Sequence, residues 1–264
     1  NLYKIAQTDS TVKDAIATAI NAGVDMSMVP NNPEYKTYCE KLIELVNEGR
    51  VSQGRLDDAV RRILRVKHRL NLFEVAYTVK EDYPYFAAEK HKKSAYLAAA
   101  ESITLLKNKG SLLPAKPSSK VMVIGPAANS LNCLNGAWTH TWQGIDPQYN
   151  NFENPTIYEA IKENARTCDL YKGSLMRMIN RDEADIPSYD LSLAVNNAKD
   201  YDFAVVCLGE LPSTERPGDI YTIDMAKEQR EIVKRLSKTG IKIVLVLVEG
   251  RPKIISDIVP LADA

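Results

Sequence analysis

The sequence predicts an α/β protein with a doubly wound parallel sheet in its C-terminal part. Apolar stretches and amphipathic helical stretches alternate after residue 120, which is the pattern of successive strand–helix units. The apolar stretches are continuous, as in FAVVCLG (203–209), rather than alternating with polar residues. Continuous apolar strands are typical of a parallel sheet that is covered by helices on both faces.

The first 73 residues predict helices on either side of one short strand. Helices are expected at 11–22, 34–48 and 52–73, and an apolar strand at 24–30. Gly23 and Gly49 suit C-caps, and Ser52 suits an N-cap. A single strand cannot satisfy its own backbone hydrogen bonds. We therefore expect the last unit of a repeating α/β domain, whose earlier strands lie outside this sequence.

A linker is predicted at 74–86, and the parallel-sheet domain at 87–264. Helices are expected at 87–107, 156–165, 192–199 and 227–237, and strands at 120–126, 167–173, 202–209 and 241–250. The sequence ends about where another strand would begin, so this α/β sandwich is expected to be truncated.

Composition argues against several classes of protein. The 34 basic and 34 acidic side chains of the 264 residues give a formal net charge of zero, so neither nucleic acid nor a membrane surface is an expected partner. No apolar run approaches the roughly 20 residues that span a bilayer, and no signal peptide is visible. The four cysteines show no metal-binding spacing, and neither a disulfide framework nor a metal or other cofactor is expected.

Three unusual loops follow the predicted strands, at 126–144, 209–220 and 249–252. Ligands of open parallel sheets bind outside the carboxyl ends of the strands, so the three loops should share one edge. We expect strands 120–125 and 203–208 to be neighbours, which would place the first two loops side by side.

The first loop holds both tryptophans of the chain, Trp138 and Trp142. They could pack as a hydrophobic plug, or an exposed indole could stack on the apolar face of a sugar ring. His140 between them suits a structural hydrogen bond as well as a ligand contact.

The second loop holds two carboxylates, Glu210 and Glu215. Glu210 directly follows a buried strand, which favours a structural ion pair with Arg251. Glu215 lies in mid-loop, where a side chain is either simply solvated or available as a general acid. Glycosidases need a second carboxylate. Asp219 is a poor candidate, because Gly218-Asp219 is typical of a turn. Asp25, at the lone strand, is expected to lie buried beside its own helix. The second carboxylate is therefore expected outside this chain or is absent.

Seven blocks, in order, resemble glycoside hydrolase family three, the β-glucosidase and exo-β-glucanase group. They are INAGVDMSMVP, LDDAVRRILRVKHRLNLFE, ESITLLKNKGSLLP, KVMVIGPAAN, WTHTWQG, GELPSTERPGDI and EGRP. The resemblance spans nearly all of 11–260. It implies that 1–73 is the C-terminal part of a (β/α)₈-like barrel joined to the α/β sandwich. It also implies a retaining enzyme that removes β-linked sugar units from non-reducing ends, without a cofactor, in the periplasm or outside the cell.

The resemblance also implies roles for single residues. Glu215 matches the acid/base glutamate of a Gly-Glu-x-Pro-x-Thr-Glu-x-x-Gly-Asp loop, and Trp142 matches a tryptophan that clamps the sugar next to the cleavage point. The family nucleophile is an aspartate in a Ser-Asp-Trp motif just before the equivalent of NLYKIA, and this sequence lacks that motif. The chain by itself is therefore expected to be inactive without the remainder of the barrel. The expected substrate is a β-linked glucoside or oligosaccharide.

Three departures and two alternatives stay open. Ser213 replaces a usual aromatic residue, which puts the preferred linkage in doubt, and Asn71 and Ala137 replace glycines. The doubly wound sheet also suggests a nucleotide-binding module, although VMVIGPAAN has one glycine and no phosphate-binding lysine. The other alternative is a sugar-binding scaffold without activity. A Ser-Asp-Trp motif directly before Asn1 would distinguish an enzyme from that scaffold.

Overall fold

The computed structural model describes residues 11–29, 33–74, 78–174, 176 and 190–264. The chain divides into two compact units, residues 1–98 and 99–264. The division falls within helix α5 (Glu89–Ser102). The linker predicted at 74–86, and the domain limits on either side of it, stay predictions.

The first unit contains three helices, and a small apolar core lies between the first two of them. They are α2 (Val12–Asn21), α3 (Glu34–Asn47) and α4 (Gln53–Arg69), and they match the predicted helices to within four residues. The side-chain oxygens of Thr11 and Ser52 accept hydrogen bonds from backbone amides in the first turns of α2 and α4, as N-caps do. The buried core consists of Ile16, Ala17, Ile20, Leu45 and Val51.

The segment predicted as a strand at 24–30 does not form a strand among the described residues. Residues 24–29 have no regular secondary structure, and Pro30 lies outside the described residues. A strand forms only where a second strand satisfies its backbone groups, and the described part of this unit contains no other strand. Met26 and Met28 are consequently 74% and 87% exposed. That this segment pairs with chain outside these residues stays a prediction.

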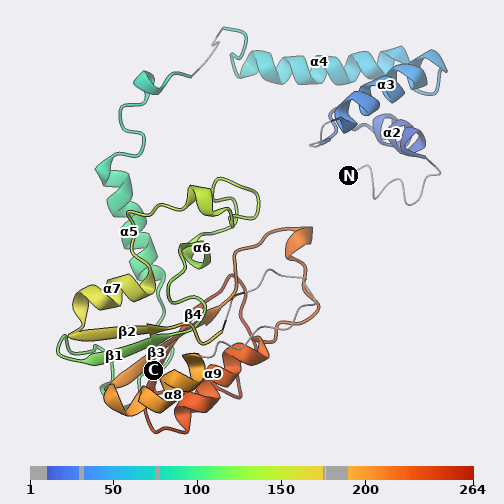
Figure 1. The fold of residues 1–264 in the computed structure, drawn as a ribbon. Coiled ribbons are helices and arrows are strands. Elements are labelled where there is room, and N and C mark those ends of the chain that lie inside the picture. Colours follow the sequence, from blue (N-terminus) through green and yellow to red (C-terminus); the bar gives the residue numbers. More distant parts are fainter. Residues whose placement is uncertain (1–10, 30–32, 75–77, 175, 177–189) are drawn as a thin grey trace. The chain divides into compact units, whose positions relative to one another are not determined.

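The second unit is a four-stranded parallel sheet with helices on both faces (Figure 1). Its strands are β1 (Lys120–Ile124), β2 (Thr167–Tyr171), β3 (Phe203–Gly209) and β4 (Lys242–Val248), in the order β2-β1-β3-β4. Helix α7 (Ile157–Asn164) covers one face, and α8 (Asp190–Asn197) and α9 (Lys227–Ser237) cover the other. The doubly wound fold and the pairing of β1 with β3 are confirmed.

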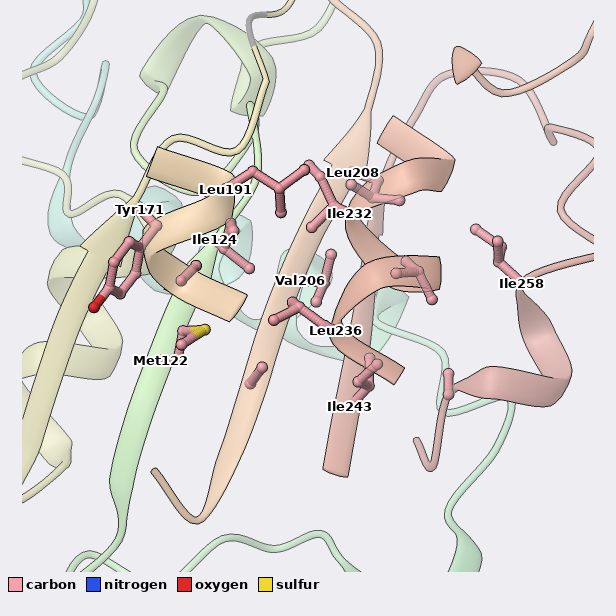
Figure 2. Packing of buried hydrophobic residues seen from close by; sticks show 14 of the residues in the cluster. Met122, Ile124, Tyr171, Leu191, Val206, Leu208, Ile232, Leu236, Ile243 and Ile258 are labelled. Carbon is pink, nitrogen blue, oxygen red and sulfur yellow. The ribbon is translucent and has the colours of Figure 1, made fainter. Parts of the chain in front are cut away.

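Two apolar cores lie on opposite faces of the sheet, because successive side chains of a strand point to opposite sides. Figure 2 shows the core beneath α8 and α9, where Leu191, Ile232 and Leu236 pack against the strands. The other core contains the alternate strand residues, including the fully buried Cys207. All four cysteines are free. Beyond β4, the backbone of Asp263 and Ala264 forms hydrogen bonds with Ile243 and Leu245, so these residues lie along the outer edge of β4.

Candidate functional site

The carboxyl ends of β1 and β3 are the point where the strand order reverses. From β1 the chain goes to β2 on one side, and then returns to β3 and β4 on the other side. Open parallel sheets bind ligands at this switch point. The tryptophan loop (126–144) leaves β1 there, and the glutamate loop (209–220) leaves β3 beside it.

Gly209 allows the glutamate loop to begin in close contact with β4. Its φ is 155°, and a Cβ at this position would lie 1.8 Å from the carbonyl oxygen of Val248. The buried side chain of Gln229 accepts a hydrogen bond from the Gly209 amide at 2.9 Å and donates one to the Gly209 carbonyl at 3.0 Å. Gln229 therefore holds both the amide and the carbonyl of Gly209, the residue that leads into Glu210.

A reciprocal amide pair joins the two loops. The side chain of Gln143 donates to the Thr214 carbonyl at 3.1 Å, and the Thr214 amide donates to the Gln143 side-chain oxygen at 3.0 Å. Gln143 directly follows Trp142, and Thr214 directly precedes Glu215. The two loops thus lie side by side, as the predicted strand order requires.

Both indoles of the tryptophan loop are exposed, by 64% for Trp138 and 45% for Trp142. This exposure does not agree with a hydrophobic plug and leaves ring surface available to a ligand. Trp138 and His140 have φ values of 65° and 57°, which are uncommon for bulky residues. His140 stacks on Tyr149 with ring centroids 5.1 Å apart, which is a structural contact within the same segment.

Glu215 is exposed, and its backbone lies in a sparsely populated region, with φ 55° and ψ −154°. Such a conformation costs about 1–3 kcal/mol for a residue other than glycine. Within the described part of the chain, its carboxylate forms no hydrogen bond or ion pair. A depression of about 290 Å³ is lined by Glu215 together with Leu211, Ser213, Thr214, Asp219 and Arg251. The carboxylate is available to a ligand there.

Glu210, in contrast, is anchored. Arg251 donates to both of its carboxylate oxygens, at 3.2 and 2.8 Å, and the Lys253 ammonium lies 2.8 Å from one of them. Arg251 also donates to the Gly218 carbonyl and the Ser213 hydroxyl. Burial by itself raises the pKa of Glu210, but the hydrogen bonds from Arg251 and Lys253 outweigh it and lower the pKa below its usual value. Arg251 thereby ties both ends of the glutamate loop together.

Three residues of this region were not predicted from the sequence: Gln143, Glu249 and Lys253. One carboxylate oxygen of Glu249 is buried without a hydrogen-bond partner, and burial together with the negative charge of Glu210 raises the pKa of Glu249. The sequence could have predicted the role of Lys253, since this second cation follows Arg251 by two residues. The pairing of Gln143 left no such signal, because its partner is backbone.

Two other carboxylates were considered from the sequence, Asp219 and Asp25. Asp219 lines the same depression, and Asp25 in the first unit forms ion pairs with Arg55 at 2.7 Å and Arg62 at 3.8 Å. Among the described residues, no cluster of histidine, cysteine, aspartate or glutamate could hold a metal ion. None of the helices in the described part of the chain is long and apolar enough to cross a membrane.

Replacing Arg251 by methionine is expected to lower the free energy of unfolding of the second unit by about 2 kcal/mol, because hydrogen bonds to a charged, largely buried carboxylate are lost. Lys253 still faces Glu210, which limits the loss. Urea unfolding followed by tryptophan fluorescence measures it, since both tryptophans lie in this unit. The exposed Arg216→Met variant is the control and should differ from the original chain by less than about 0.5 kcal/mol.

The same ion pair predicts a pH dependence. The pKa of Glu210 is lower in the folded chain than its unfolded value of about 4.3. The stabilisation is therefore complete above that unfolded value and is lost as the pH falls through the folded pKa. The stability difference between the original chain and Arg251→Met should narrow in acid, and a constant difference from pH 7 to pH 3 would contradict this account.

Comparison with known proteins identifies the class to which this arrangement belongs. Residues 103–264 match the glycosyl hydrolase family 3 C-terminal domain, and residues 2–66 match the glycosyl hydrolase family 3 N terminal domain. The parallel sheet and its two loops are thus a glycosyl hydrolase domain. The chain belongs to glycosyl hydrolase family 3.

Relatives agree with this assignment. The chain is 36% identical to a lysosomal beta glucosidase of Dictyostelium discoideum, over 94% of this chain and 30% of the relative. It is 33% identical to a periplasmic beta-glucosidase of Salmonella typhimurium, over 93% of this chain and 34% of the relative. A crystal structure of beta-glucosidase from Listeria innocua in complex with glucose matches with a TM-score of 0.73 at 26% identity, covering 95% of this chain and 32% of that one. The chain spans about a third of the length of the proteins that it matches.

Proposed function

We propose that these residues form part of a retaining, exo-acting β-glycosidase that removes glucose from the non-reducing end of β-linked glucosides or gluco-oligosaccharides. Glu215 is the general acid and base, and Trp142, with Trp138, binds the sugar. One observation carries the proposal. An exposed glutamate, which has no side-chain partner among the described residues, lies on a loop that is hydrogen-bonded to an exposed tryptophan loop, at the switch point of a parallel sheet. The relatives named as β-glucosidases support the substrate class.

In the proposed reaction, Glu215 gives its proton to the glycosidic oxygen while the bond from that oxygen to the anomeric carbon breaks. An aspartate outside these 264 residues attacks the anomeric carbon from the other face and forms a glycosyl-enzyme. Glu215 then takes a proton from water, whose oxygen displaces the aspartate, so two inversions give net retention. Retention requires the two carboxyl groups to be about 5–5.5 Å apart.

The proposed domain plan follows the family. Residues 1–73 complete a barrel that supplies the nucleophile, 74–86 link the domains, and 87–264 belong to the α/β sandwich that supplies Glu215. The name of the periplasmic relative supports a periplasmic or secreted location.

The stereochemistry of hydrolysis tests this proposal. In NMR spectra of an aryl β-glucoside reacting with the complete protein, the β-anomer of glucose should appear first, before mutarotation. The 264-residue chain alone should release no glucose. Early appearance of the α-anomer, or hydrolysis by the chain alone, would overturn the proposed mechanism.

A further inference from the structure

We infer, on the basis of the proposed function, that Gln143 is a positioning residue for Glu215. Its side-chain amide holds the backbone at Thr214 and so fixes the acid/base carboxylate relative to the sugar-binding Trp142. The two chain neighbours of this amide pair are the two residues that the proposed reaction uses.

The geometry of the pair suits this role. Both polar atoms of the Gln143 amide are used, one as donor at 3.1 Å and one as acceptor at 3.0 Å, and both backbone groups of Thr214 are satisfied. The half-buried side chain of Gln143 therefore pairs with the amide and the carbonyl of Thr214, as the backbone of a neighbouring strand would. Two bonds from one planar group restrict rotation of the Thr214 backbone, which a single bond would allow.

The backbone conformation of Glu215 depends on contacts such as the Gln143–Thr214 pair. A φ of 55° is unfavourable for glutamate and persists only where the surroundings impose it. On one side of Glu215, Gln143 holds Thr214. On the other side, Arg251 holds the Gly218 carbonyl. Without the Gln143 bonds, the backbone can relax toward negative φ and carry the carboxylate away from the scissile oxygen. A misplacement of about 1 Å can cost about 100-fold in rate.

Amide hydrogen exchange in the 264-residue chain tests the contact itself. In Gln143→Met, the Thr214 amide should exchange at least about 10-fold faster, because its acceptor is gone. The Gly209 amide is an internal control, since it donates to the side chain of Gln229 in the same kind of bond, and it should not change. The matched variant is Gln148→Met, whose amide bonds to Asp146 within its own turn, and it should leave the Thr214 exchange unchanged.

Activity of the complete protein tests the positioning role. In Gln143→Met, kcat/KM for substrates with poor leaving groups should fall about 10-fold, while kcat/KM for activated aryl glucosides falls less than about 2-fold, since these need little protonation. A general loss of structure would lower both equally. Gln143→Glu should recover activity in acid relative to Gln143→Met, because a protonated carboxyl can donate and accept as the amide does.

The outcomes separate the two hypotheses. If Thr214 exchange is unchanged in Gln143→Met, or if both substrate types lose activity equally, Gln143 does not position Glu215. If Glu215→Ala depends on the leaving group and Gln143→Met does not, only the role of Gln143 is overturned. If Glu215→Ala shows no such dependence, the proposed function fails, and the positioning role fails with it.

Discussion

Replacing Glu215 by alanine is expected to lower kcat/KM of the complete protein for glucosides with poor leaving groups by about 1,000-fold. General acid catalysis contributes roughly 10²–10⁴-fold, and Glu215 is an exposed carboxylate of the glutamate loop that forms no ion pair with any other described residue. Activated aryl glucosides leave without a proton, so their kcat/KM should fall less than about 10-fold. Steady-state kinetics over a series of leaving groups measures the contrast.

Azide provides a second test of the same residue. Without Glu215, water is not activated and the glycosyl-enzyme accumulates. The azide anion needs no general base, so it attacks the anomeric carbon directly, releases the nucleophilic carboxylate and forms a β-glycosyl azide. In Glu215→Ala, added azide should raise kcat on activated substrates, and the azide product identifies the reaction. In the original enzyme, azide should have little effect.

A matched control tests whether the loss of activity is specific to Glu215 or follows from replacing any exposed glutamate. Glu231 is an exposed residue on α9, and Glu231→Ala should keep kcat/KM within about 2-fold for every substrate. Equal losses on good and poor leaving groups in Glu215→Ala, without rescue by azide, would assign the acid/base role to another residue.

The sheet could be predicted from the sequence because its signals are local. Each strand is a continuous apolar run between helical stretches, and β3 is buried along its whole length. The same kind of signal at 24–30 is not accompanied by a strand among the described residues, because a strand also needs a partner, and pairing depends on residues far away in the sequence. An apolar run therefore identifies a segment that can form a strand without establishing that it does.

The candidate site was predictable to the level of loops and charges. Parallel strands place their carboxyl ends at one edge, which brought 126–144 beside 209–220, and Glu210 and Arg251 form the ion pair that their loops suggested. The bonds of Gln143 were not predictable, since they join residues 71 positions apart through backbone atoms. The positive φ of Glu215 is likewise imposed by its surroundings rather than by residue type.

Replacing Gly209 by alanine is expected to destabilise the second unit by about 4 kcal/mol or more, the range reached only by a few disruptive mechanisms. Two of them act together here. A φ of 155° is strained for any residue with a Cβ, and the added carbon would lie 1.8 Å from the Val248 carbonyl oxygen. The clash involves backbone on both sides, so no rotamer change relieves it. Because β3 and β4 are hydrogen-bonded from Phe203 to Gly209, the strands must separate at their carboxyl ends.

Urea unfolding followed by tryptophan fluorescence measures the loss in Gly209→Ala. Gly136→Ala is the control in the same unit, because its φ is not positive and no atom lies within 4 Å of the new carbon. That change should alter the free energy of unfolding by less than about 0.5 kcal/mol. Since Gly209 directs the chain into Glu210 and the loop of Glu215, the alanine variant should also lose protection from hydrogen exchange at the Gly209 and Thr214 amides together. A Gly209→Ala chain as stable as Gly136→Ala would mean that β3 and β4 are not in close contact at this end of the sheet.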